Sequence, residues 1–191
     1  MHARFNSLTV LALVAVCLAP VFAGAQEFTM HARVSYDAGG TLVSGGTGEE
    51  WHHAPINTLV LPGDTLWVDK GGTMELEFPA GSFLRMADGS KAEVKGMPPN
   101  ANVRGWQGSF YVQRLSRASG DFVFQSPAAV MSIAPDCAVR IDVVDEGNTT
   151  VSVHWGQVTV RTAEGGEVLL TDGERCWIDS GYLPSEATPF D

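Results

Sequence analysis

The sequence predicts an all-β fold: an antiparallel sandwich, or a β-roll or solenoid-like domain, built from short strands. Three observations predict it. Glycine, proline and aspartate interrupt the chain at short, regular intervals. Between these breaks apolar and polar residues alternate, as in MELEF, where Met74, Leu76 and Phe78 share one face. No stretch after the first 25 residues has helical periodicity.

The first 25 residues have the features of a secretory signal peptide. Leu8–Leu18 is an almost unbroken apolar run, and Ala23-Gly24-Ala25 fits a small-residue cleavage site. The run has about 11 residues, whereas a bilayer-spanning helix needs roughly 20. We therefore predict signal peptide 1–25 and a periplasmic or secreted protein, with no stable membrane insertion after cleavage.

Net charge narrows the range of partners. The formal net charge of −10 becomes −11 when Arg4 is removed with the signal, because residues 1–25 contain no acid. Nucleic acids and anionic membranes are bound by clustered Lys and Arg. We therefore expect no nucleic-acid partner, and a surface that repels other copies of the chain.

Turn residues divide the predicted β domain, 31–180, into two halves. In the first half, about 31–95, each strand follows a turn such as Asp37–Gly40, Pro62–Asp64 or Gly71–Gly72. Its expected strands are 31–36, 41–43, 65–68, 73–78, 82–86 and 91–94. In the second half, about 105–180, the expected strands are 109–115, 122–124, 128–133, 138–144, 149–155, 158–160, 167–170 and 175–179.

Prolines mark the joint and the tail. Gly96–Asn100 contains two consecutive prolines, which lack backbone donors and exclude a central strand. We interpret this segment as the joint between the two halves of one domain. Pro184 and Pro189 predict a flexible tail over 183–191.

The five tryptophans fall into two groups. Trp67, Trp155 and Trp177 lie within expected strands, and we expect them in the core. Trp51 and Trp106 lie beside loops or glycine turns, so either is a candidate for a recognition surface.

His52 and His53 beside Trp51 add polar candidates to that surface. Adjacent residues of an extended segment point to opposite sides, so the pair suits one metal ion only in an irregular loop. We expect a solvated loop, and no metal or cofactor. No nucleophile motif occurs, and acid pairs such as Glu75 with Glu77 are expected on a wetted sheet face. We predict no catalytic residue.

Cys137 and Cys176 are the cysteines outside the predicted signal peptide. Export to an oxidising compartment makes them a disulfide candidate. The alternative is two separate buried thiols, because spacing does not show whether their Cα atoms approach closely enough.

From about Arg33 to Ile178 the chain resembles a FecR-type domain, particularly the exported FecR-like proteins of bacteria. The matching segments run in order along the chain: GTLVS at 40–44, LPGDTLWV at 61–68, GTMEL at 72–76, AGSFLRM at 80–86, QGSFYV at 107–112, HWGQVTV at 154–160 and LTDGE at 170–174. In FecR proteins proper, this domain passes a signal between an outer-membrane receptor and a cytoplasmic sigma factor. Here we expect neither an anti-sigma segment before the domain nor an internal transmembrane helix.

The resemblance implies a non-enzymatic binding or signalling module in the bacterial envelope, whose partner is an envelope protein or a glycan. It supplies no catalytic residue. Two alternatives remain open: a secreted carbohydrate-active hydrolase with a carboxylate pair, and a structural envelope protein that assembles through its strand edges.

Overall fold

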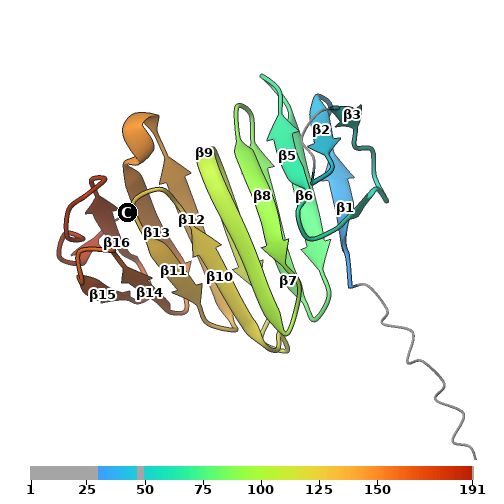
Figure 1. Cartoon of the computed structure of the whole chain (residues 1–191). Coiled ribbons are helices and arrows are strands. Elements are labelled where there is room, and N and C mark those ends of the chain that lie inside the picture. The colour runs from blue at the N-terminus through green and yellow to red at the C-terminus, as the bar shows by residue number, and fades with distance from the viewer. Residues whose placement is uncertain (1–29, 47–49, 191) are drawn as a thin grey trace, which may run out of the picture.

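The computed structural model describes residues 30–46 and 50–190, and it is built almost entirely of β-strands (Figure 1). The described part contains no α-helix, and its single helical element is the 3-10 turn η1 (Asp145–Gly147). The all-β prediction is confirmed. The predicted signal peptide, 1–25, lies outside the described residues.

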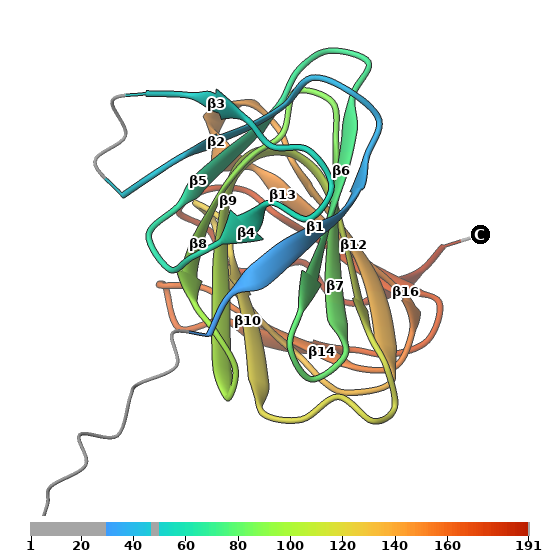
Figure 2. The same cartoon turned by 90° about the vertical axis from the view of Figure 1, so that its right-hand side faces the viewer.

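The strands form two layers that face each other across one core (Figures 1 and 2). Layer A contains, in spatial order, β4 (Leu59–Val60), β1 (Ala32–Asp37), β6 (Thr73–Phe78), β7 (Ser82–Ala87), the second part of β9, β12 (Cys137–Val143), β13 (Thr149–Trp155), β16 (Glu174–Ile178) and β17 (Thr188–Pro189). Layer B contains β3 (His52–His53), β2 (Thr41–Ser44), β5 (Thr65–Val68), β8 (Lys91–Gly96), the first part of β9, β10 (Asp121–Gln125), β11 (Val130–Ile133), β14 (Val158–Arg161) and β15 (Glu167–Leu170).

Strand β9 (Asn100–Arg114) belongs to both layers and holds them together. Its first part pairs with β8 and β10 in layer B, and its second part, from Gly108 onward, pairs with β7 and β12 in layer A. The chain therefore folds over at 105–108. Because β9 pairs with strands from both predicted halves, the halves share one hydrogen-bonded framework and one core.

Several other connections also cross between the layers, and they stack closely. In the first part of the chain the crossings lie at the edge that is uppermost in Figure 1, at 38–40, 69–72 and 88–90. A Cβ on Gly72 would lie 2.2 Å from the carbonyl oxygen of Gly39, so only glycine lets these two crossings touch. In the second part the crossings lie at the opposite edge, at 134–136, 156–157 and 171–173.

The core is lined by alternate residues of each strand. Its largest fully buried side chains include four phenylalanines that meet in two edge-on or tilted pairs, Phe78 with Phe122 at 5.4 Å and Phe110 with Phe124 at 5.0 Å between ring centroids. Phe110 and Phe124 also flank Gly105, where a Cβ would lie 2.4 Å from the Phe124 ring. The fold of β9 therefore depends on a glycine at this point.

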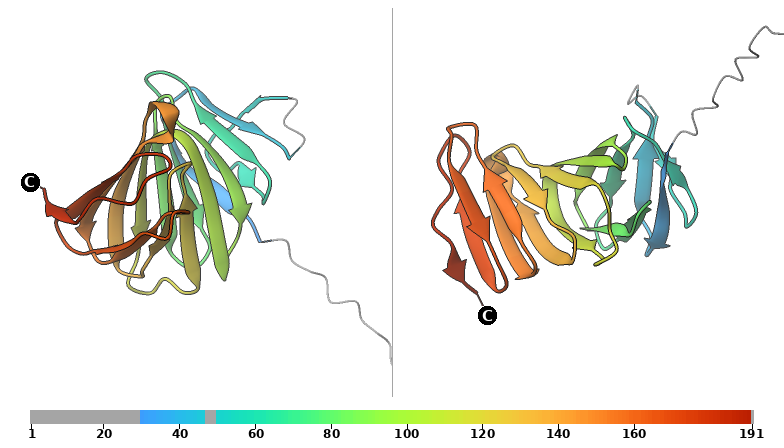
Figure 3. Two further views of the ribbon diagram at one scale, coloured as in Figure 1. Left: turned by 60° about the vertical axis from the view of Figure 1, so that its left-hand side comes forward. Right: turned by 90° about the horizontal axis from the view of Figure 1, so that it is seen from below.

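Two features differ from the expected antiparallel sandwich with a loose tail. The β9–β10 pair is parallel, because β9 descends in layer A before the chain returns to layer B to begin β10. The C-terminal residues, expected to be flexible, lie along β16: the Ser185 amide donates to Trp177 and the Phe190 amide to Gly173. Pro189 is accommodated because an edge strand leaves one side unpaired. This edge strand and the N-terminal strand β1 lie at opposite ends of the molecule (Figure 3).

The prediction that Trp155 and Trp177 lie in the core is wrong, and Trp67 is only partly buried. Trp155 and Trp177 are 41% and 43% exposed. Trp177 lies between two buried residues, Cys176 and Ile178, so strand alternation directs its ring outward. Trp155 faces outward because the register shifts at the start of the β12–β13 pairing.

Candidate functional site

The outer face of layer A carries a row of charged and aromatic side chains across its central strands. Cross-strand pairing aligns Glu75 in β6, Arg85 in β7, Tyr111 in β9 and Arg140 in β12. Each of these residues alternates with buried neighbours in its strand, so the row points away from the core. We call this row, with Ser109 and Asp142 beside it, the central face.

The charges of the central face are paired with one another. The Arg85 Nε donates to Glu75 Oε2 at 2.5 Å, and Arg140 donates to both Asp142 carboxylate oxygens at 2.9 Å. The Ser109 hydroxyl also donates to Asp142, at 2.5 Å. This geometry fixes the Arg140 guanidinium while leaving its side chain 55% exposed. The hydrogen bonds to Asp142 raise the pKa of Arg140, so its charge is permanent.

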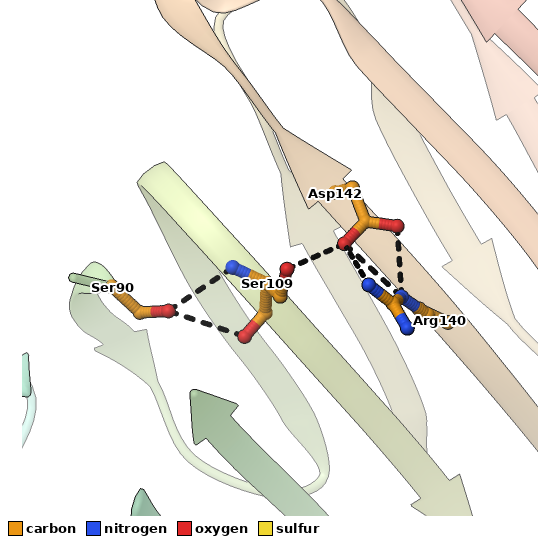
Figure 4. Close-up of polar contacts among 4 residues, drawn as sticks. All are labelled: Ser90, Ser109, Arg140 and Asp142. Atoms are coloured by element: carbon orange, nitrogen blue, oxygen red, sulfur yellow. Dashed lines mark hydrogen bonds and ion pairs between the residues drawn. The ribbon is translucent and has the colours of Figure 1, made fainter. Parts of the chain in front are cut away.

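Ser109 is itself fixed from the other layer (Figure 4). The Ser90 hydroxyl, at the β7–β8 crossing, accepts from the Ser109 amide at 3.1 Å and donates to the Ser109 carbonyl at 3.2 Å. The position of Asp142, and through it Arg140, therefore depends on how two crossings stack at the upper edge.

A surface depression with a volume of about 390 Å³ lies within the central face, lined by Arg85, Ser109, Tyr111 and Arg140 among others. It forms because β7 pairs with β9 only as far as Met86 opposite Phe110. Beyond that point β7 leaves layer A, while β9 continues beside β12 as far as Gly108 opposite Val143. The depression lies where β7 and β9 separate. The volume falls within the usual range for ligand sites.

Aromatic rings continue the face towards the C-terminus. The Arg85 guanidinium carbon lies 5.8 Å from the centre of the Tyr111 ring, which lies 5.7 Å from His154. His154 in turn meets Phe190 edge-on at 5.5 Å. Burial raises the pKa of Tyr111, while the Arg85 charge acts in the opposite direction, so the phenol is protonated at neutral pH and can donate.

The arrangement is suited to recognition by arginine and tyrosine side chains. Arginine and tyrosine are enriched among residues that dominate protein–protein binding. The acids weighed as hydrolytic pairs are engaged elsewhere, since Glu75 binds Arg85 and Glu77 binds Arg33. The surface depressions around Asp88, Asp121 and Asp172 each contain one carboxylate, whereas glycoside hydrolysis uses two.

The predicted recognition residues Trp51, His52 and His53 lie at an outer edge of layer B. His52 and His53 form β3, and the side chains of all three are exposed. His53 Nε2 lies 3.6 Å from an Asp37 oxygen, and His52 Nε2 lies 3.7 Å from a Glu50 oxygen. Within the described part of the chain, no group of three or more His, Cys, Asp or Glu residues is placed to hold a metal ion.

Trp106 lies apart from these residues. It is 38% exposed on β9, with the Arg104 guanidinium 3.9 Å from its ring centre. Strands β2, β5 and β8 separate it from β3. The structure therefore does not join Trp51 and Trp106 into one surface, and their role in recognition stays a prediction.

The two cysteines are buried and unbridged. Cys176 is aligned with Ile141 through Val151, so β13 lies between the two cysteine-bearing strands. Cys137 lies four residues along β12 from Ile141. Two strand spacings and four residues separate the Cα atoms by well over about 7 Å, the limit for a disulfide. Of the alternatives left open by the sequence, the structure has two separate thiols.

We expect these thiols to make stability fall at alkaline pH. Burial raises the pKa of Cys137 from 9.0 to about 11 and that of Cys176 from 9.0 to about 12. Above pH 9 the unfolded chain loses these protons while the folded chain keeps them, so the free energy of unfolding decreases as pH rises towards 11. The slope is at most about 1.4 kcal/mol per pH unit for each thiol.

Urea unfolding between pH 8 and pH 10.5 measures this slope. The Cys137→Ala, Cys176→Ala double variant is the control, because it keeps every other titrating group. The wild type should lose stability more steeply than the variant, and parallel curves would contradict the assignment.

The arginines and the tyrosine of the central face were not singled out from the sequence. Arg85 could have been found, since a hairpin around Pro79–Gly81 places it opposite Glu75. The position of Arg140 beside Tyr111 depends on pairing between β9 and β12, which are distant in sequence. No local pattern specifies that pairing.

The fold and the central face define the class of protein. It is a two-layered, all-β domain whose outer face presents aromatic rings and arginines that are ion-paired with carboxylates. No protein-family model matches the sequence, and no curated protein does. Among solved structures, the fold is similar to two crystal structures of a proposed anti-sigma factor from Parabacteroides distasonis, at 1.65 and 2.50 Å resolution.

For each of these structures the TM-score is 0.57 and the sequence identity 15%; the match covers 66% of this chain and 60% of the other. The likeness is one of fold. In the described residues, no helix has the length and hydrophobicity needed to cross a bilayer.

Proposed function

We propose that this chain is a FecR-like binding or signalling module of the bacterial envelope, exported by its N-terminal segment, that recognises a partner protein and catalyses no reaction. Two findings support the proposal. The fold is similar to that of a proposed anti-sigma factor. The central face presents exposed, orientationally fixed arginines around a tyrosine.

The central face is the observation that carries the proposal. Holding Arg85 and Arg140 in place before binding reduces the conformational entropy lost on association. Both arginines remain about half exposed, at 52% and 55%, so a partner can reach them. A surface with acidic side chains or backbone carbonyls would complement them.

The two alternatives receive less support. The hydrolase hypothesis requires two acids on opposite sides of one pocket. The depressions around Asp88, Asp121 and Asp172 contain one acid each. Assembly through strand edges is hindered at the C-terminal edge of layer A, where the outermost strand, β17, contains Pro189.

Affinity capture tests the proposal. The chain, immobilised through a C-terminal tag, is incubated with envelope extract from its source organism, and bound proteins are identified by mass spectrometry. We expect one envelope protein to be enriched reproducibly over the same bait denatured before immobilisation. Recovery of no protein, or of the same proteins on both baits, would contradict a protein partner.

A further inference from the structure

Arg114, the last residue of β9, is a buried cation placed between the two layers. Only 2% of its surface is exposed. Its neighbours in the flanking strands of layer A are Ser82 and Cys137. Its side chain points from layer A towards the core, at the edge of the molecule opposite the β7–β8 crossing.

The guanidinium is held by three neutral acceptors. Nη1 donates to the Ile133 carbonyl at 2.5 Å, Nη2 to the Gly120 carbonyl at 2.8 Å, and Nε to the Ser82 hydroxyl at 3.3 Å. Within the described residues, none of the ion pairs includes Arg114. A guanidinium has five N–H donors, so two remain for another acceptor.

Arg114 also separates two strands. The β10–β11 ladder ends at Val123 opposite Ser132, where one more step would have paired Phe122 with Ile133. The Ile133 carbonyl instead accepts from Arg114. The strands diverge around the guanidinium, and a cavity of about 380 Å³ lies at this point.

The walls of this cavity are chemically mixed. Arg114 and Gln157 supply hydrogen-bond donors, and the hydroxyls of Ser132 and Thr159 lie on the layer B side. Val123 and Leu169 add apolar surface. Asp121 also lines the cavity and brings one carboxylate to it. Burial lowers the pKa of Arg114, and the Asp121 charge acts in the opposite direction. A buried arginine nevertheless keeps its charge, and a carboxylate is the group that matches its planar donors best.

We propose that the Arg114 cavity is a binding site for a carboxylate group, carried either by a small organic acid or by the C-terminus of a peptide. The carboxylate accepts from the two remaining guanidinium donors, and the carbon chain lies against Val123 and Leu169. This site is separate from the central face, and the inference does not depend on the proposed function.

Titration with sodium acetate, followed by ¹H–¹⁵N NMR of the labelled chain, tests the inference. We expect saturable shifts, with a Kd of millimolar order, at the amides of Gly120, Asp121 and Ala134 and at Arg114 Nε–H. Sodium chloride at the same ionic strength should not produce them. Identical shifts with chloride would show an adventitious ion only and overturn the inference, as would the absence of shifts.

Two variants make the test independent of Arg114, whose replacement would leave buried carbonyls without donors and could prevent folding. Thr159→Glu places a carboxylate at the cavity wall, so it should compete internally and abolish the acetate shifts. Ser152→Glu, on the outer face of layer A, is the matched control and should leave them unchanged. Acetate binding that survives in Thr159→Glu would contradict the site.

The source of the carboxylate is distinguished by N-acetyl-trialanine and its C-terminal amide. If the free acid binds about tenfold more tightly than acetate and the amide does not bind, the site takes peptide ends. If the free acid and acetate bind equally, it takes small acids. Equal binding of the acid and the amide would exclude carboxylate recognition.

Discussion

The Gly108→Ala variant is expected to lose about 4 kcal/mol of unfolding free energy, which is a large part of the stability of a domain of this size. Gly108 has a φ of +105°, a conformation that L side chains rarely adopt. A Cβ there would lie 2.2 Å from the Ser90 hydroxyl and 2.5 Å from the Ser90 Cα. Ser90 is fully buried and cannot move aside.

Gly89→Ala is the matched control, because Gly89 is in the neighbouring crossing and also has a positive φ, of +68°. A Cβ on Gly89 would meet no atom within 4 Å, so only the backbone cost of about 1 to 2 kcal/mol remains. Urea denaturation followed by circular dichroism measures both variants. Equal losses would show that the stacking of the crossings does not determine stability.

Much of the fold could be predicted from the sequence because apolar and polar residues alternate along most of the strands. Thr73–Phe78 was predicted with its observed ends and faces, since Met74, Leu76 and Phe78 are buried. Glycine turns marked the ends of strands, but they did not show whether the chain forms a hairpin or crosses to the other layer. Both connections need the same permissive backbone.

The strand that organises the fold was only half predicted. Residues 109–115 were expected as a strand, whereas 100–107 were not, because Gly105 and Gly108 read as turn residues after the prolines. These glycines instead let β9 fold past Phe124 and Ser90. Such contacts between residues distant in sequence leave no local pattern.

The outward tryptophans illustrate a different limit. Trp67 lies between the buried residues Leu66 and Val68, so alternation alone indicates that it faces outward. Its size and hydrophobicity suggested burial instead. Trp155 could not be placed in this way, because a shift in register changes which residues at the end of β13 face outward. The central face depends on the same long-range pairing, which explains why it was missed.

Replacing both arginines of the central face is expected to have the largest effect on partner capture. In the Arg85→Gln, Arg140→Gln double variant, the side chains keep much of their length and lose their charge and their paired donors. Since arginines are frequent hot-spot residues, we expect capture of the envelope partner to weaken about tenfold or more. Stability should change little, because exposed ion pairs contribute at most about 1 kcal/mol each.

The control is Arg33→Gln combined with Arg161→Gln. These arginines are 46% and 54% exposed and each binds one glutamate, but they lie outside the central face. The control removes the same number of exposed ion pairs and the same net charge. A general electrostatic attraction would therefore affect both double variants equally.

The most direct measurement is the amount of partner that each double variant captures from envelope extract, relative to the wild-type chain on the same resin. Recognition through the central face predicts that the Arg85, Arg140 variant retains about a tenth of the partner or less, while the Arg33, Arg161 variant retains at least about half. Equal retention by the two variants would contradict the central claim that the central face is the binding surface.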